Sequence, residues 1–207
     1  MFEICPKCGN YEWDKQVSVD KKSVCCPKCG ASWENLAFPL LILTGCSGVG
    51  KTTTARKLME RQQDFVVLDG DILFTADKGE YMDWVERIEG LTRDIMQCKK
   101  PVLWTMAGNL DKLKEAWNHR FFPEIYCLAL VCSEAELRRR MTEGRGIADK
   151  EWIRNSVEYN NYFLEHDRLG DLALEHLDIT MLDSGQAAKQ VELWVHSKLA
   201  NFQHFTT

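Results

Sequence analysis

Apolar residues along the chain gather in short continuous runs, and the stretches between the runs repeat their apolar positions with helical spacing. Short runs that are almost wholly apolar are typical of parallel strands buried on both faces; they span residues 40–44, 65–68, 101–105, 125–131 and 179–182. The helical patterns span residues 53–60, 81–98, 110–119, 150–164 and 186–199. Because strands and helices alternate, the pattern predicts a three-layer α/β domain with a parallel sheet.

The first 38 residues do not follow this alternation. Residues 5–9 and 26–30 both read Cys-Pro-Lys-Cys-Gly, and the alternating stretch 16–20 between them predicts a short hairpin. Two such turns supply four thiolates, the tetrahedral ligand set that suits Zn²⁺. The segment resembles a zinc ribbon. The ligands expected for a structural zinc ion are Cys5, Cys8, Cys26 and Cys29.

The alternative for these cysteines is a pair of redox dithiols, and Cys25 is expected to be a spare thiol because Cys26 fits the repeat. Four thiolates leave no open coordination position, so the ion is expected to be structural. Pro39 marks the predicted boundary between a zinc ribbon (residues 1–38) and a larger domain (residues 39–207).

Composition narrows the class of protein. With 207 residues, of which 45% are hydrophobic and 28% charged, the chain has the makeup of one globular domain with a small appendage. No apolar run is long enough to span a membrane, and the N-terminus shows no secretion signal, so we expect a cytoplasmic protein that does not bind membranes. The net charge of −5 gives no overall attraction to nucleic acid.

Residues 45–52 carry a phosphate-binding loop. They read Gly-Cys-Ser-Gly-Val-Gly-Lys-Thr, the P-loop (Walker A) pattern, between an apolar run and a helical one. In this motif backbone N–H groups cradle the phosphates of ATP, Lys51 reaches the β- and γ-phosphates, and the Thr52 hydroxyl ligates Mg²⁺. The expected nucleotide-binding residues are Gly45, Ser47, Gly48, Val49, Gly50, Lys51, Thr52 and Thr53.

Further features narrow the type of P-loop protein. The chain has no Asn-Lys-x-Asp motif of GTPases, and run 101–105 is not followed by the acid that motor-type ATPases carry there. Run 65–68 leads into Asp69-Gly-Asp71. Together with the P-loop, this resembles the P-loop small-molecule kinases, such as the adenylylsulfate, gluconate, shikimate and nucleoside or nucleotide kinases. The resemblance covers about residues 40–200 and implies a five-stranded parallel sheet of order 2-3-1-4-5.

The resemblance also implies roles for individual residues. Asp71 is the expected general base and Asp69 its orienting or metal-linked partner, although the two could be exchanged. Taken alone, the two acids would instead indicate an Asx turn that caps the following segment, and it is their place beside the P-loop that favours a functional role. Arg140 and Arg145 correspond to lid arginines that stabilise the transferred phosphoryl group, whereas Arg138 and Arg139 also fit a solvated helix face. Ser184 is expected near the nucleotide base.

The acceptor pocket is predicted less directly. By the same resemblance, the helix over 81–98 borders it, with Trp84, Arg87 and Arg93 as candidate contacts, and segment 104–109 lines it. Apolar and aromatic lining there favours a nucleoside or nucleotide over a sugar acid. We therefore expect an ATP- and Mg²⁺-dependent phosphotransferase that moves the γ-phosphate to a hydroxyl or phosphate of a small molecule.

Two alternatives remain at this level. The first is a polynucleotide 5′-hydroxyl kinase whose ribbon holds the strand, although equal numbers of acidic and basic residues in the ribbon disfavour nucleic acid. The second is an ATP-sensing adaptor without catalysis, which binds a protein partner through the ribbon. Paired carboxylates and lid arginines disfavour the adaptor, because a sensor needs no general base.

Overall fold

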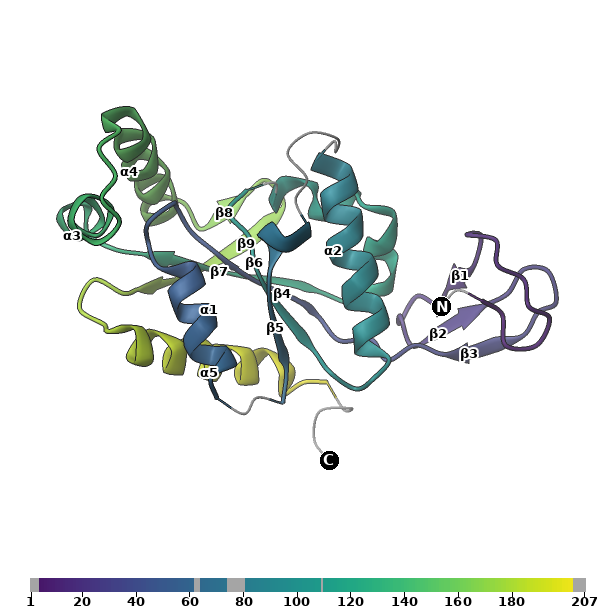
Figure 1. Ribbon diagram of the computed structural model, residues 1–207. Helices are drawn as coiled ribbons and strands as arrows, with labels where there is room; N and C mark the ends of the chain where they lie inside the picture. Colours follow the sequence, from purple (N-terminus) through teal and green to yellow (C-terminus); the bar gives the residue numbers. More distant parts are fainter. Residues whose placement is uncertain (1–3, 62–63, 74–80, 109, 203–207) are drawn as a thin grey trace.

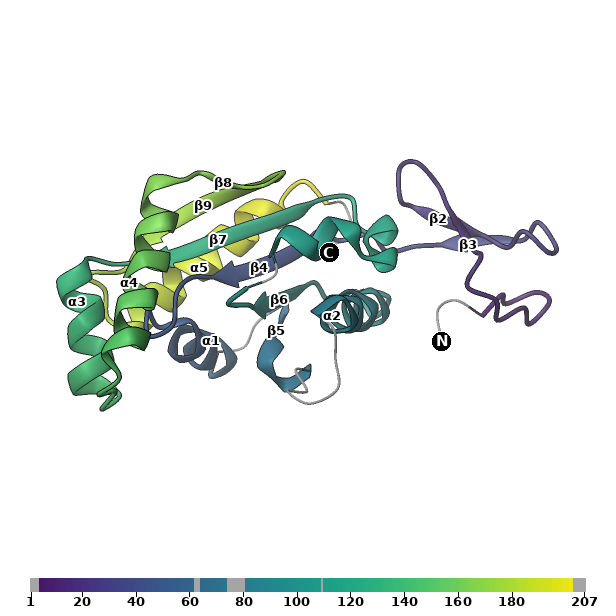
Figure 2. The ribbon, with the colours of Figure 1, turned by 90° about the horizontal axis from the view of Figure 1, so that it is seen from above.

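The computed structural model describes residues 4–61, 64–73, 81–108 and 110–202 of the chain. A small antiparallel sheet stands at one end of the molecule, and a larger α/β part makes up the rest (Figures 1 and 2). The small sheet contains β1 (Gln16–Val17), β2 (Ser23–Cys25) and β3 (Ser32–Glu34) in the order β1-β2-β3. The predicted hairpin between the two cysteine turns is formed by β1 and β2.

The central sheet has six strands in the order β5-β6-β4-β7-β9-β8. Its strands are β4 (Leu40–Thr44), β5 (Val66–Asp69), β6 (Val102–Thr105), β7 (Ile125–Val131), β8 (Arg168–Leu169) and β9 (Leu172–Asp178). The first five in this order are parallel and have the predicted 2-3-1-4-5 arrangement. The prediction of five strands missed β8, a two-residue strand that pairs antiparallel with β9 at the edge.

Helices cover both faces of this sheet, so the three-layer prediction is confirmed. In Figure 1, α1 (Lys51–Met59) and α5 (Ser184–Leu199) lie below the strands, whereas α2 (Tyr81–Met96) and α4 (Lys150–Glu165) lie above them. The short helix α3 (Glu134–Arg139) begins where capping was predicted, because the Ser133 side chain accepts a hydrogen bond from the backbone N–H of Glu136. It continues into a π-helical turn, η4 (Arg140–Gly144).

The last parallel strand was predicted in the wrong place. It runs over Leu172–Asp178, not over residues 179–182. Only one face of β9 is covered, since Leu172 and Leu174 are buried while Ala173 and Glu175 are exposed. Such an alternating strand lacks the continuous apolar run on which the prediction relied.

The helix predicted over 110–119 is also wrong. Two 3₁₀ helices, η2 (Leu110–Glu115) and η3 (Trp117–Phe121), replace it, and the backbone at Ala116 between them is extended. The carboxylate of Glu86 in α2 accepts hydrogen bonds from the backbone N–H groups of Trp117 and Asn118. These bonds to α2 satisfy backbone N–H groups at the start of η3 that a continuous helix would have bonded internally.

The hydrophobic core lies around the sheet. Every residue of β4 and β6 is buried, and Phe38, ahead of β4, is fully buried in the same cluster. Among the described residues, no helix combines the length and the apolar character needed to cross a membrane.

Candidate active site

The P-loop joins β4 to α1 through backbone conformations that only glycine adopts easily. Gly45 has a φ of 139°, and a Cβ there would lie 2.6 Å from the carbonyl oxygen of Leu130 in β7. Gly48 has a φ of 83°, and a Cβ would lie 2.6 Å from Cγ of Met141 in η4. The loop therefore curls closely between β7 and the segment formed by α3 and η4, called the lid below, with its N–H groups at the N-terminus of α1.

Lys51, the first residue of α1, reaches back over the loop. Its ammonium group donates hydrogen bonds to the carbonyl oxygens of Gly45 (2.7 Å) and Cys46 (2.9 Å). Burial lowers the pKa of Lys51, and the charges of Asp71 and Asp69 oppose this effect. The two carboxylates thus lie within electrostatic reach of the P-loop cation, as the sequence predicted for a shared site.

The two carboxylates differ in how they are held. Asp69 ends β5, and its Oδ1 accepts hydrogen bonds from the Thr105 hydroxyl (2.9 Å) and the Asp71 backbone N–H (3.2 Å). Asp71 lies in the 3₁₀ turn η1 (Gly70–Leu73) and is exposed. Among the described residues, its carboxylate has no hydrogen-bond partner. Asp69 is fixed against β6, and Asp71 is available to a ligand. The Asp71-to-Asp69 bond is also the Asx turn that the sequence allowed.

Arg140 connects the lid to the P-loop and to the segment that follows β9. Its guanidinium donates hydrogen bonds to the Val49 carbonyl (2.6 Å), the Ile179 carbonyl (2.9 Å) and the Glu136 carboxylate (2.7 Å). Hydrogen bonds from Arg139 and Arg140 lower the pKa of Glu136 to about 2, so its charge persists over the physiological pH range. Arg140 is therefore bonded to the P-loop, to the segment after β9 and to its own helix.

The other lid arginines differ from Arg140. Arg145 follows the π-helical turn, is exposed and lines the cleft. Arg138 and Arg139 are exposed and pair with Glu134 and Glu136 on their own helix, as the solvated-face interpretation predicts. Arg139 nevertheless also borders the cleft, which the sequence did not indicate.

Ser184 lies at the opposite wall, at the first position of α5. Asp183 caps this helix in a capping box with Gln186. Residues 183–185 thus form the cap and the start of α5, and both Asp183 and Ser184 line the cleft.

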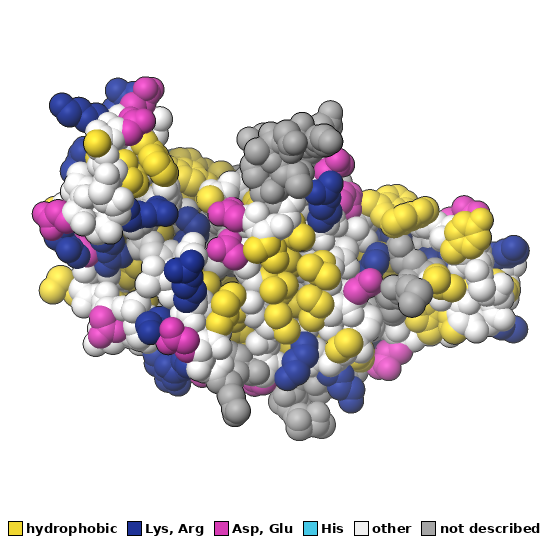
Figure 3. Space-filling view, in the orientation of Figure 1, with side chains coloured by type: hydrophobic (Ala, Val, Ile, Leu, Met, Phe, Trp, Pro, Cys, Tyr) yellow, Lys and Arg dark blue, Asp and Glu magenta, His cyan; other side chains and the backbone are white. Residues whose placement is uncertain are grey.

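These elements enclose an open cleft of about 690 Å³ at the carboxyl ends of the parallel strands. On the face in Figure 3, basic side chains gather around the lid and two acidic side chains lie nearer the middle. Gly45 is buried beneath the loop. The other residues predicted for nucleotide binding and catalysis line the cleft: Ser47, Gly48, Val49, Gly50, Lys51, Thr52, Thr53, Asp69, Asp71, Arg140, Arg145 and Ser184.

The predicted acceptor contacts are only partly brought to the cleft. Thr105, Met106 and Ala107 line it. Trp104 is fully buried and donates to Thr92, so it belongs to the core. Asn109 lies outside the described residues.

The candidate contacts on α2 do not line the cleft. Trp84 and Arg93 are buried and donate hydrogen bonds to Gly70 and Asn118, respectively. Arg87 is exposed. The sequence analysis did not identify Thr105 as the residue that holds Asp69. The signal that could have indicated it is a polar residue at the end of the apolar run 101–105.

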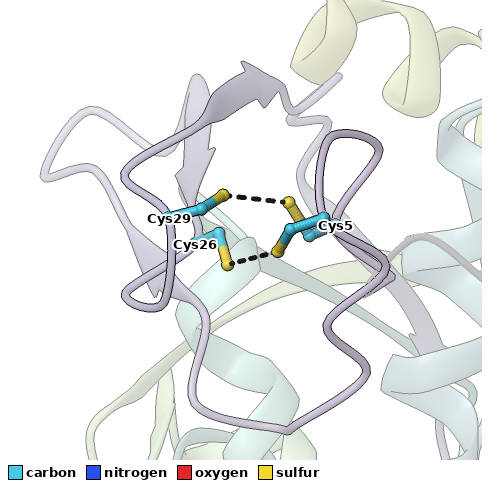
Figure 4. Close-up of side chains that lie close together, drawn as sticks. Cys5, Cys26 and Cys29 are labelled. Atoms are coloured by element: carbon cyan, nitrogen blue, oxygen red, sulfur yellow. Dashed lines mark hydrogen bonds between the residues drawn. The ribbon is translucent and has the colours of Figure 1, made fainter.

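The four predicted zinc ligands converge in the ribbon, where Figure 4 labels Cys5, Cys26 and Cys29. Their sulfur atoms all lie within 4.8 Å of one another, with 3.6 Å between Cys5 and Cys29 and 3.8 Å between Cys8 and Cys26. Sulfurs bound to one Zn²⁺ at about 2.3 Å are about 3.8 Å apart. The donor set and spacing fit a tetrahedral zinc ion.

The surroundings of the cluster favour a thiolate at Cys26 but not at Cys29, where, against a hydrogen bond from the Ala31 backbone, burial and the neighbouring cysteines raise the pKa to about 12. Although burial opposes it, hydrogen bonds from the backbone N–H groups of Cys29 and Lys28 lower the pKa of Cys26 to about 6. The Asn10 side chain also donates to the Cys26 sulfur (3.8 Å). Cys25 is outside the cluster, as expected for a spare thiol.

The comparisons with known proteins agree with this architecture. Residues 41–162, more than half of the chain, match the family described as AAA domain. No curated protein matches the sequence.

Three solved structures share the fold at low sequence identity. A sugar kinase from Janibacter sp. is 15% identical with a TM-score of 0.56, and the match covers 76% of this chain and 94% of that one. The tunicamycin resistance protein of Deinococcus radiodurans is 17% identical with a TM-score of 0.54, covering 76% and 95%. A gluconokinase from Sinorhizobium meliloti is 19% identical with a TM-score of 0.51, covering 79% and 97%. The chain belongs to the AAA domain family, and its fold is that of the P-loop small-molecule kinases.

Proposed function

We propose that the protein is an ATP- and Mg²⁺-dependent phosphotransferase that moves the γ-phosphate of ATP to a hydroxyl group of a small molecule. The observation that carries this proposal is the position of Asp69 and Asp71 in one cleft with Lys51 and the lid arginines. A site that only senses ATP needs the cations but not a pair of carboxylates facing them.

The distribution of charge around the cleft suggests the class of acceptor. Lys51 and the arginines line the nucleotide side, whereas the described residues of the acceptor side are Asp69, Asp71, Thr105, Met106 and Ala107. Two carboxylates disfavour an anionic acceptor. Of the acceptors expected from the sequence, this favours a nucleoside over a nucleotide. The two kinases of similar fold are a sugar kinase and a gluconokinase, so we also include neutral sugars and sugar acids among the acceptors to test.

Each of these residues has its own role in the proposed reaction. Asp71, whose carboxylate is available, accepts the proton of the acceptor hydroxyl, and Asp69 fixes the turn that carries it. The acceptor oxygen then forms a bond to the γ-phosphorus as the bond to the bridging oxygen breaks, and ADP leaves with the electron pair. Lys51, Arg140 and Arg145 stabilise the charge on the phosphoryl oxygens. Mg²⁺ at the Thr52 hydroxyl would neutralise phosphate charge.

The test is transfer of label from γ-labelled ATP in the presence of Mg²⁺. The acceptors are nucleosides, nucleoside monophosphates, neutral sugars, sugar acids and 5′-hydroxyl oligonucleotides. We expect label on a neutral hydroxyl acceptor. Lys51→Ala should abolish transfer. Lys57→Ala should not, because Lys57 lies in the same helix but pairs with Glu60 outside the cleft.

Two results would contradict this proposal. Tight ATP binding without any labelled acceptor would favour the ATP-sensing adaptor. Labelling of oligonucleotides alone would favour the polynucleotide kinase.

A further inference from the structure

The ribbon lies at the end of the molecule opposite the lid. Figures 1 and 2 show α3 and α4 at one end, the ribbon at the other, and α2 beside the ribbon. The P-loop cleft opens at the carboxyl ends of the parallel strands, whereas the ribbon joins β4 at its amino end. Any effect of the ribbon on the cleft must therefore be carried through an element that reaches both.

Asn35, between β3 and β4, forms the centre of the junction. It is 1% exposed, and its amide donates hydrogen bonds to the carbonyl oxygens of Lys21 in the ribbon (2.6 Å) and Phe121 in η3 (3.3 Å). Its side-chain oxygen accepts a hydrogen bond from Gln97 (3.1 Å), the residue directly after α2. Gln97 also accepts one from the backbone N–H of Leu36 (3.1 Å). The ribbon is thus bonded to the C-terminal end of α2.

Further polar groups, buried at Arg93 and Asn118 and half-buried at Gln97 and Glu86, continue these contacts along α2. Gln97 donates to the carbonyl oxygen of Arg93, and the Arg93 guanidinium donates to Asn118 (2.8 Å). Asn118 in turn donates to the carboxylate of Glu86, one helical turn from the start of α2 (3.0 Å). Buried networks with their partners satisfied are rigid, because each unmade bond leaves a desolvated polar group.

The other end of α2 holds the turn between the two carboxylates. Trp84 is buried, and its indole N–H donates to the carbonyl oxygen of Gly70 (2.8 Å), between Asp69 and Asp71. A Cβ on Gly70 would lie 2.7 Å from the Thr105 carbonyl oxygen and 3.1 Å from the Trp84 ring. The turn is therefore clamped between β6 and α2. The helix spans 16 residues, about 24 Å at 1.5 Å per residue.

We propose that the zinc ribbon braces α2 and thereby positions the Asp69–Gly70–Asp71 turn of the cleft. Gln97 and Trp84 are positioning residues: Gln97 bonds the helix to the ribbon, and Trp84 bonds the helix to the turn. Only the consequence for catalysis rests on the proposed phosphotransferase function. The mechanical coupling itself does not depend on it.

The experiment is hydrogen–deuterium exchange of the full-length protein without nucleotide. It compares wild type with Gln97→Ala, with Trp84→Phe, which keeps a ring but removes the N–H, and with Leu91→Ala as a control at an exposed residue of α2. Gln97→Ala should raise exchange about tenfold in residues 69–73 as well as near the ribbon. Trp84→Phe should raise exchange in residues 69–73 and leave the ribbon unchanged.

The proposal is overturned if either variant leaves residues 69–73 protected as in wild type, or if Leu91→Ala has an equal effect. A strand far from the junction, β7, should stay protected in all variants, which shows that the fold is retained. If the protein transfers phosphate, Gln97→Ala should also raise the KM for the acceptor and leave the affinity for ATP unchanged. If the exchange changes occur as expected but the wild-type protein transfers no phosphate, the proposed function is refuted and the coupling between the ribbon and the turn stands.

Discussion

The ribbon and the P-loop domain are stabilised in different ways. In the described residues 4–35, Val24 is the only buried aliphatic side chain, and the other buried residues are cysteine, asparagine and lysine. The P-loop domain buries a continuous cluster of aliphatic and aromatic residues around its sheet. So small an apolar core cannot hold a segment of about 35 residues, whereas a four-thiolate zinc site can. We therefore expect the two regions to respond differently to metal, to mutation and to pH.

The largest expected effect is loss of the ribbon on removal of its metal. Cys26→Ser should abolish binding of one zinc ion per chain and unfold the ribbon, because zinc binding in such sites is worth about 10 kcal/mol or more. Cys25→Ser is the matched control, since the Cys25 thiol is adjacent to Cys26 in sequence but lies outside the cluster. In each variant, metal analysis measures zinc binding, and hydrogen–deuterium exchange of residues 4–35 measures unfolding of the ribbon. Equal zinc content in the two variants would refute the cysteine assignment.

The next effect is confined to the cleft. Asp71→Asn should lower kcat by about 10²–10⁴-fold, the range of general base catalysis, without changing the affinity for ATP. Asp69→Asn should lower kcat less, because Asp69 acts through its bonds to Thr105 and Asp71. Steady-state kinetics on both variants compares the two roles. A larger loss in Asp69→Asn would exchange them, and full activity in both would rule out a carboxylate base.

A third prediction concerns stability against pH. Glu89 is fully buried in α2, and neither carboxyl oxygen has a hydrogen-bond partner within the described part of the chain. Burial, with the nearby charge of Glu86, raises its pKa from 4.5 to about 9. The folded state therefore keeps a proton on Glu89 at pH values where the unfolded chain has lost it. The contribution of the protonated Glu89 to the free energy of unfolding is complete below about pH 4.5 and is lost as the pH rises toward 9.

Glu89→Gln removes this pH dependence with an uncharged residue of similar shape. It should raise the free energy of unfolding of the P-loop domain by about 2–4 kcal/mol at pH 8 and change it little at pH 4.5. Urea unfolding at both pH values measures the difference. An equal effect at the two pH values would show that Glu89 is ionised in the fold.

The smallest effect is expected on the exposed face of the lid. Arg138→Ala removes only an exposed pair with Glu134 and should change stability by about 0.5 kcal/mol or less. Arg140→Ala removes three hydrogen bonds around the P-loop and should lower kcat by about 10²-fold or more. Thermal melting measures the stability of each variant, and steady-state kinetics measures its kcat. Similar losses in both variants would contradict the distinction.

What the sequence could predict depended on local pattern. The P-loop, the two cysteine turns and the start of α3 each combine a short motif with a specific backbone requirement, and the structure places them as expected. Continuous apolar runs located β4 and β6, which are fully buried, and β7, whose last five residues are buried. The half-exposed strand β9 was misplaced because its apolar residues alternate with polar ones.

The remaining features depend on contacts between residues distant in the chain. Glu86 redirects the backbone at Trp117, 31 residues away, and so breaks a helix that periodicity alone favoured. Gln97 meets Asn35 across 62 residues. Trp84 and Arg93 have the chemistry of ligand-binding residues, but packing turns them into the interior. No spacing rule contains such information.

The most direct test of the central claim is the identity of the phosphorylated product. Phosphorus NMR of the wild-type protein with ATP, Mg²⁺ and the best acceptor distinguishes a phosphate monoester from inorganic phosphate and from a diphosphate. We expect ADP and a monoester on an uncharged acceptor, formed in equal amounts and absent with Lys51→Ala. Inorganic phosphate alone, or a new diphosphate bond, would contradict it.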